Sequence, residues 1–131
     1  MIPRLLISGA TSGVGKTSIT SAIIYGLKKR GYTVQPFKVG PDYIDPSYLT
    51  SISHNDAKNL DVWLMGKKEL VKTFVRSSTS DISVIEGVMG YYDGFGGKTN
   101  YASTHHVATL LKVPVILILD ASKTSRSIAA T

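Results

Sequence analysis

The sequence predicts an α/β fold, with a doubly wound parallel sheet and flanking helices. Short runs rich in β-branched residues alternate with segments in which apolar residues recur every three or four positions. Such alternation is typical of parallel strands joined by right-handed helical crossovers. The last apolar run, residues 113–119, is nearly continuous, as expected of a strand buried on both faces.

We expect four strands and four helical segments. The first helical segment, residues 16–30, has apolar or small residues at positions 19, 22, 23, 26 and 27 and ends in basic residues before Gly31, which is a stop signal. Two stretches rich in glycine, proline or polar residues, 40–53 and 87–97, are expected to be loops. The expected strands are residues 4–8, 33–39, 82–85 and 113–119, and the other expected helices are residues 61–65, 69–75 and 104–112.

The end of the chain does not look like the end of a finished domain. Residues 122–131 begin a helix and then stop without a glycine, a proline or a closing strand. Four strands also make a thin core for this architecture. We therefore expect residues 1–131 to be the N-terminal part of a larger, truncated domain.

Composition narrows the class of protein. The 131 residues include 15 Lys and Arg against 9 Asp and Glu, a net charge of +6, but the basic residues are scattered, which favours a site that attracts anions over a nucleic-acid surface. No apolar run approaches the ~20 residues that span a membrane, and the short N-terminal run is a poor signal peptide. The chain has no cysteine. We expect a cytoplasmic protein without disulfides, a membrane partner or a nucleic-acid partner.

The strongest functional signal is the glycine-rich segment Gly9–Thr17, a P-loop with alanine in place of its first glycine. Glycines let backbone N–H groups approach phosphate oxygens, and the following helix points its positive end at the same anion. Lys16 would contact the β- and γ-phosphates, and the Thr17 hydroxyl can bind Mg²⁺. A simple turn that caps a helix is the alternative, but the segment lies between an expected strand and an expected helix. The expected nucleotide-binding residues are Ser12, Gly13, Val14, Gly15, Lys16, Thr17 and Ser18.

Two further segments end expected strands. Glu86 follows the strand at 82–85, where a second anchor for the metal is expected; an exposed carboxylate is the alternative. Lys38 ends the second strand and is followed by Asp42 and Asp45, which could hold Mg²⁺ and orient an anionic substrate. Without the P-loop, this second segment would be only a proline-rich turn.

Taken together, these segments resemble the cobyrinic acid a,c-diamide synthase family. The chain equally resembles the related synthases that act on nickel sirohydrochlorin in coenzyme F430 synthesis, and more distantly dethiobiotin synthetase. The resemblance covers essentially all 131 residues and rests on positions 9–17, 38–46, 59–65, 86–90 and 93–94.

The resemblance implies a P-loop NTPase-type fold and an ATP-dependent, glutamine-hydrolysing amidation of the a and c acetate groups of a tetrapyrrole, in cobalamin or coenzyme F430 biosynthesis. ATP and Mg²⁺ would be the cofactors. Thr17, Asp45 and Glu86 would surround the metal, and Lys38 would stabilise the transferring phosphoryl group or the substrate carboxylate. The implied catalytic set is Lys16, Lys38, Asp45 and Glu86, with Asp42, Tyr43 and Asp93 as weaker substrate candidates.

Departures from the family leave two other hypotheses open. The family takes ammonia from a C-terminal glutaminase domain with a catalytic cysteine, so we expect this chain to be inactive with glutamine by itself. A partitioning or positioning ATPase that works as a binding module is the first alternative, although residues 9–12 lack its second lysine. The second is an inactive fragment whose unpaired sheet edge favours self-association, for instance as a homodimer.

Of the residues after the second loop, Ser103 and Thr104 are expected to cap a helix, and His105 and His106 to lie at the surface.

Overall fold

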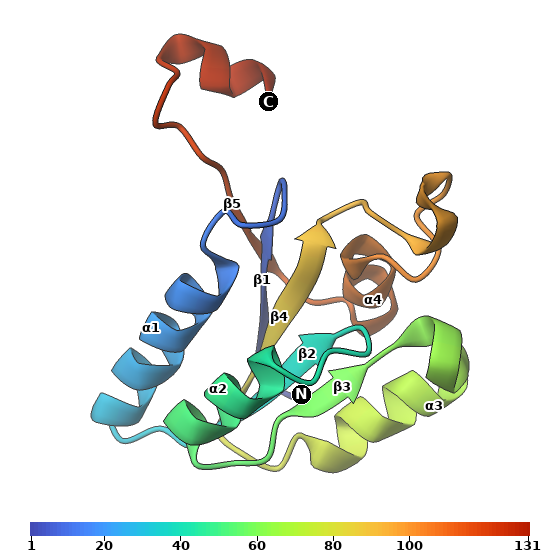
Figure 1. The fold of residues 1–131 in the computed structure, drawn as a ribbon. Helices are drawn as coiled ribbons and strands as arrows, with labels where there is room; N and C mark the ends of the chain where they lie inside the picture. The colour runs from blue at the N-terminus through green and yellow to red at the C-terminus, as the bar shows by residue number, and fades with distance from the viewer.

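The computed structural model describes all 131 residues and contains a five-stranded, fully parallel sheet between two pairs of helices (Figure 1). The strand order is β3-β2-β4-β1-β5, so the predicted doubly wound α/β architecture is confirmed. None of the helices is long and apolar enough to cross a membrane. The elements are β1 (Arg4–Gly9), α1 (Lys16–Lys29), β2 (Val34–Val39), α2 (Asp45–Ser53), β3 (Lys58–Leu60), α3 (Val62–Ser77), β4 (Ile82–Gly90), η1 (Phe95–Gly97), α4 (Thr104–Leu111), β5 (Val115–Ile118) and η2 (Arg126–Ala130).

Each face of the sheet has its own apolar core. Helices α1 and α2 cover one face through Ile24 and Leu49, which pack with Ile7 of β1 and Val84 of β4. Helices α3 and α4 cover the other face, where Phe74 of α3 lies 5.1 Å from the ring of Phe37 in β2. Because side chains alternate across a strand, β1, β2 and β4 supply both cores and fix the sheet between the two helix layers.

Strand β5 differs from its prediction. We expected the most completely buried strand, but β5 lies at the edge of the sheet beside β1, with Ile116 and Leu117 42% and 48% exposed. The continuous apolar run predicted a strand correctly, but such a run does not specify the position of a strand in the sheet. Beyond β5 the chain leaves the body of the molecule, and η2 contributes no buried residue (Figure 1).

Several element boundaries also differ. The expected loop at 40–53 contains α2, which starts with Asp45 and Pro46 in its first turn, where a proline costs no hydrogen bond. Strand β3 was not predicted because it has only three residues. Part of the second expected loop, residues 87–90, is the end of β4. The two helices expected at 61–65 and 69–75 form α3 with a kink at Gly66, whose φ is +77°.

The buried row of α1 is shifted from the expected one. Thr20 and Ile24 face the sheet, whereas Ile19 is exposed. The Thr20 hydroxyl donates 2.7 Å to the Lys16 carbonyl, so this polar side chain is satisfied within the helix and can be buried.

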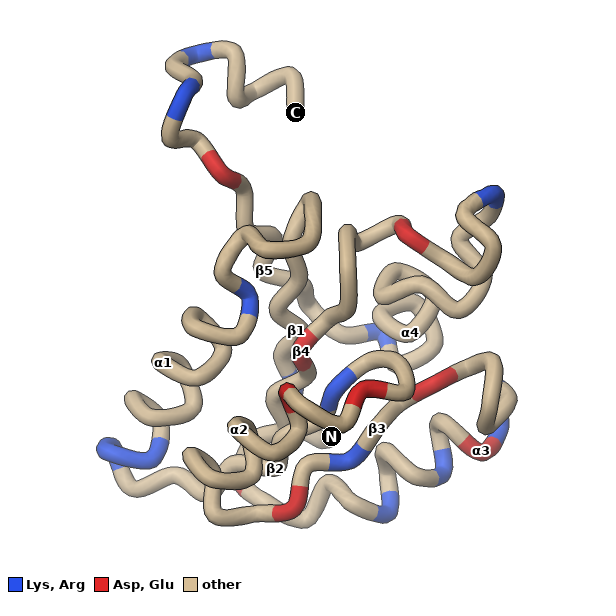
Figure 2. The backbone as a smooth tube through the Cα atoms, viewed as in Figure 1, with Lys and Arg blue, Asp and Glu red and all other residues tan.

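Around the whole chain, basic residues are distributed over α1, α3 and the C-terminal segment (Figure 2).

Candidate functional site

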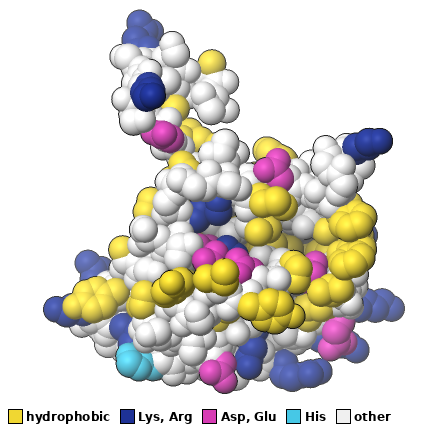
Figure 3. Space-filling view, viewed as in Figure 1, with side chains coloured by type: hydrophobic (Ala, Val, Ile, Leu, Met, Phe, Trp, Pro, Cys, Tyr) yellow, Lys and Arg dark blue, Asp and Glu magenta, His cyan; other side chains and the backbone are white.

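A polar cavity of about 410 Å³ lies at the carboxyl edge of the sheet, between the turn after β1 and the segment after β2. Acidic and basic side chains meet in this hollow, with hydrophobic side chains around it (Figure 3). Nine of the residues predicted from the sequence line it, together with Val88 and Met89. The predicted ones are Ser12, Gly13, Gly15, Lys16, Thr17, Ser18, Lys38, Asp42 and Asp45.

The glycine-rich turn has the backbone geometry that an anion site needs. Gly13 and Gly15 adopt φ of +74° and +101°, in the left-handed region that glycine enters without steric cost. The N–H groups of both residues donate to no backbone carbonyl, and α1 begins at the next residue, Lys16. Free N–H groups and the positive helix end therefore face the same cavity.

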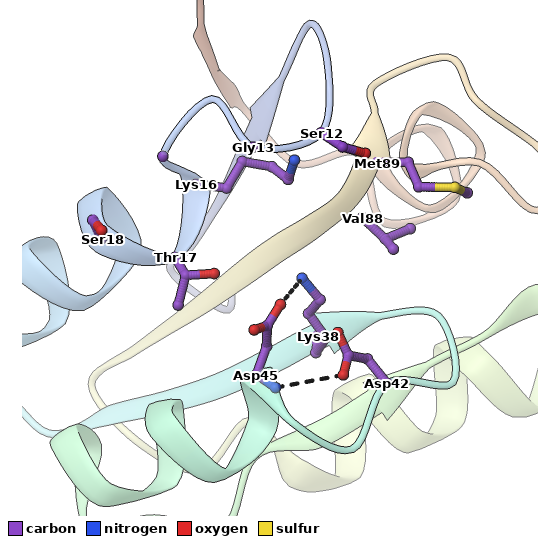
Figure 4. A pocket seen from close by; sticks show the side chains of 11 residues that line it. Ser12, Gly13, Lys16, Thr17, Ser18, Lys38, Asp42, Asp45, Val88 and Met89 are labelled. Atoms are coloured by element: carbon purple, nitrogen blue, oxygen red, sulfur yellow. Dashed lines mark hydrogen bonds and ion pairs between the residues drawn. The ribbon is translucent and has the colours of Figure 1, made fainter.

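Lys16 reaches back over this turn. Its side chain is only 8% exposed, and its Nζ donates 3.2 Å to the Thr11 carbonyl (Figure 4). Burial and the neighbouring Lys38 lower the pKa of Lys16, while Glu86 and Asp45 act in the opposite direction. An anion that enters the cavity would relieve both unfavourable effects on the lysine.

Sheet register brings Lys38 and Glu86 together. The two residues are paired neighbours on β2 and β4, so their side chains project from the same face. Lys38 Nζ lies 3.6 Å from Glu86 Oε2 and donates 2.9 Å to both Asp45 Oδ2 and the Gly87 carbonyl. On the other side, the Thr17 hydroxyl donates 2.5 Å to Glu86 Oε1. Glu86 is thereby shared between the first turn of α1 and the end of β2.

The predicted metal ligands fit a hard divalent cation. Thr17, Asp45 and Glu86 offer oxygen atoms only, which is the donor type that Mg²⁺ prefers. Glu86 Oε2 is buried and accepts no hydrogen bond, so it is a carboxylate oxygen with capacity for a ligand. No three or more His, Cys, Asp or Glu side chains are arranged so that they could hold a metal ion, so the candidate set consists of two carboxylates and one hydroxyl.

The segment that carries the other carboxylates is stiffened by local bonds. Asp42 Oδ1 accepts from the backbone N–H of Ile44 at 2.9 Å and of Asp45 at 3.4 Å, which positions the start of α2 (Figure 4). Burial raises the pKa of Asp42, but these two hydrogen bonds and the charge of Lys38 outweigh it, so the net pKa is lowered. Asn59 of β3 ties the same segment to the sheet by donating to the Gly40 and Asp42 carbonyls, a role that the sequence did not reveal.

Four predicted residues do not line the cavity. Glu86 lies beneath it and reaches it through Thr17 and Lys38. Val14 packs over Gly9, where a Cβ would collide with the valine side chain. Tyr43 is 87% exposed, and Asp93 Oδ2 accepts 2.8 Å from the Gly90 N–H to close a turn.

Val88 and Met89 are the lining residues that the sequence did not predict. Between the paired positions Ile7–Glu86 and Gly9–Gly90, β4 contains more residues than β1, and Met89 has a φ of +50°. This irregularity lies in the part of β4 that lines the cavity. No local sequence signal marks it, because it arises from pairing with a distant strand.

The residues after the second expected loop lie at the start of α4, outside the cavity. The Ser103 side chain accepts from the His106 N–H at 3.1 Å, which confirms the predicted helix cap. His105 and His106 are half-buried rather than fully exposed: the first lies 3.2 Å from the Tyr91 hydroxyl, and the second accepts from the Ala102 N–H. Neither histidine lines the cavity.

The buried position of Glu86 predicts that its ionised carboxylate lowers the stability of the fold. Burial raises its pKa, against the opposing effects of Lys38 and Thr17, so the ionised carboxylate destabilises the fold above the raised pKa. This cost disappears as the pH falls below the ordinary value of 4.5. We expect Glu86→Gln to increase the free energy of unfolding by about 1 kcal/mol at pH 7.5, with the gain fading toward pH 4.

Urea denaturation at the two pH values measures this effect, with the exposed Glu69→Gln as the control for loss of one charge. A Glu86→Gln variant that is less stable than the parent at pH 7.5 would show that the carboxylate is a net stabiliser.

The class of protein that this fold and this cavity define is the P-loop nucleotide-binding domain, with a phosphate-binding turn between a first parallel strand and its helix. Comparison with known families specifies it further. Residues 5–131 match the model of the family described as "CbiA: CobQ/CobB/MinD/ParA nucleotide binding domain", and the chain belongs to this family.

Similar curated proteins are a,c-diamide synthases. The chain is 46% identical, over 98% of its length, to the cobyrinate a,c-diamide synthase of Dehalococcoides mccartyi and to the hydrogenobyrinate a,c-diamide synthase of Streptomyces coelicolor. It is 47% identical, over 96% of its length, to the cobyrinate a,c-diamide synthase of Synechococcus. The chain spans only 27–28% of the length of these relatives.

Proposed function

We propose that this chain is the ATP-binding, N-terminal portion of a glutamine-hydrolysing a,c-diamide synthase, which activates and amidates two acetate side chains of a tetrapyrrole. The observation that carries the proposal is that Lys16 and Lys38 line one cavity beside the glycine-rich turn, while Glu86 lies beneath it in contact with Lys38 and Thr17. The names of the relatives support cobyrinate or hydrogenobyrinate as the substrate. Nickel sirohydrochlorin is a further candidate from the sequence resemblance.

The chemistry requires an activated carboxylate. A carboxylate is a poor electrophile for ammonia, and transfer of the γ-phosphoryl group of ATP to its oxygen supplies a leaving group. Ammonia then attacks the carbonyl carbon, phosphate leaves, and an amide remains. The contribution of the protein is positioning and neutralisation of charge around the transferring phosphoryl group.

Each group in the cavity has a role in this scheme. The N–H groups of Gly13 and Gly15 and the Lys16 ammonium would bind the phosphates. Thr17, Asp45 and Glu86 would hold Mg²⁺, which would neutralise charge on the β- and γ-phosphates when bound. Lys38 would stabilise the transferring group or the substrate carboxylate. Asp42 holds the start of α2, and with it Asp45, in place. Tyr43 and Asp93, outside the cavity, remain candidates for contacts to the ring.

Ammonia would come from a glutaminase domain outside these 131 residues, because the thiol nucleophile of such a domain has no counterpart in a chain without cysteine. We therefore expect ammonium, but not glutamine, to serve as the nitrogen source for this chain. The open edge of β5 is also a candidate surface for self-association of the chain.

A coupled turnover assay tests the function. Phosphate release from ATP is measured with cobyrinate and ammonium, added singly and together. We expect release only with both present. An ATPase that works as a binding module is the second candidate, because the family description also names MinD and ParA. Phosphate release that ignores cobyrinate and rises with DNA or phospholipid vesicles would favour that candidate.

A further inference from the structure

The ammonium group of Lys38 occupies the space that joins the two carboxylates of the candidate metal site. Its Nζ lies 2.9 Å from Asp45 Oδ2 and 3.6 Å from Glu86 Oε2, and a third contact, 2.9 Å to the Gly87 carbonyl, holds it there. The side chain is 2% exposed, so solvent screens these contacts little. A divalent cation bound to the same carboxylates would compete with this ammonium group for the same oxygen atoms.

From this geometry we propose that Lys38 is an internal competitor of the metal and makes the binding of Mg²⁺ conditional on nucleotide. The inference rests on the proposed function and goes beyond it, because it assigns to Lys38 a positioning role before any phosphoryl transfer.

Charge balance explains how nucleotide would relieve the competition. With Lys38 between them, Asp45 and Glu86 have a combined charge of −1, which is a weak site for a divalent cation. The γ-phosphate of a nucleotide on the glycine-rich turn offers Lys38 another anion, since both lysines line the same cavity. Once the ammonium group turns toward that phosphate, the two carboxylates present −2 to the cation, and Thr17 is within reach as the third ligand.

The other charged groups at the cavity are Lys16, which interacts electrostatically with Glu86 and Asp45 without an ion-pair contact to either, and Asp42. Lys16 bonds to the turn through the Thr11 carbonyl, and the Asp42 carboxylate accepts from two backbone N–H groups. Lys38 is therefore the one cation in direct contact with both candidate metal-binding carboxylates.

The test removes the charge of Lys38 and measures metal binding without nucleotide. Mn²⁺ serves as the probe for Mg²⁺, and the free ion is counted from its electron paramagnetic resonance signal. We expect Lys38→Met in the 131-residue chain to bind Mn²⁺ at least about tenfold more tightly than the parent. The matched control is Lys28→Met. Lys28 also donates to a backbone carbonyl, that of the buried Ser53 at 2.8 Å, but it lies outside the cavity. The control is expected to bind Mn²⁺ as the parent does.

A second measurement uses the non-hydrolysable analogue AMP-PNP. In the parent, the analogue should tighten Mn²⁺ binding more than it does in Lys38→Met, because the substitution removes the competition that nucleotide relieves. Should Lys38→Met fail to fold, Lys38→Gln gives the same comparison with a polar, uncharged side chain.

Equal or weaker nucleotide-free Mn²⁺ binding by a folded, uncharged Lys38 variant overturns the inference. This result is distinguishable from failure of the proposed function, in which the parent chain binds neither AMP-PNP nor Mn²⁺ together with it.

Discussion

Replacing Lys16 by alanine is expected to weaken ATP binding by at least about a hundredfold, as judged from the loss of two charge-assisted contacts to phosphate. The lysine is held over the glycine-rich turn by its bond to the Thr11 carbonyl, so its ammonium group is already close to where the phosphates would lie. The variant should fold normally, because burial disfavours the charge of this side chain in the absence of a ligand.

Isothermal titration calorimetry with ATP and Mg²⁺ measures the change. Lys29→Ala, at the exposed C-terminal end of α1, removes the same charge from the same helix and should leave the dissociation constant unchanged. An unaltered ATP affinity in Lys16→Ala would remove the P-loop assignment and with it the proposed chemistry.

Gly90→Ala is expected to destabilise the fold by about 2 to 3 kcal/mol, and to weaken ATP binding as well. A Cβ at Gly90 would lie 2.6 Å from the Ala10 carbonyl and 2.6 Å from Asp93 Oδ2. Ala10 is the first residue of the glycine-rich turn, and Gly90 pairs with Gly9 across the sheet. Because the colliding carbonyl belongs to the backbone, relief requires a shift of the turn that binds phosphate.

Thermal unfolding and ATP calorimetry on the same protein measure both effects. Gly26→Ala is the matched control, because a Cβ at Gly26 meets no atom within 4 Å and lies within α1. That control should be neutral or stabilised by up to about 1 kcal/mol. A Gly90→Ala variant as stable as the parent would mean that the end of β4 adapts without disturbing β1.

The elements that the sequence predicted well are those with a strong local pattern. The glycine-rich turn between β1 and α1 is specified by the residue types that such a turn requires, and the amphipathic α4 follows from the spacing of its apolar residues. The Ser103 cap, which was expected from the family resemblance, is confirmed as well. Short or irregular elements escaped prediction. Strand β3 consists of three residues, and it exists because Phe37, Lys38 and Val39 of β2 offer it hydrogen-bond partners.

The candidate site shows the same division. Its residue types and most of its lining could be predicted, because P-loop geometry ties Ser12 through Ser18 to one turn. The place of Val88 and Met89 in the lining could not be predicted, since they lie in the irregular part of β4, which depends on how β4 pairs with β1. Tyr43 and Asp93 were named from resemblance alone, and their side chains lie outside the cavity.

By itself the sequence determined the local chemistry of this protein: a turn that can bind phosphate, a lysine and a hydroxyl at the start of a helix, and charged residues at the ends of strands. Only the tertiary structure decided which of these charges meet. Lys38 and Glu86 are 48 positions apart in the chain, yet sheet register makes them neighbours and places Asp45 against the same ammonium group. Register depends on the packing of both sheet faces against their helices, which is a property of the whole fold.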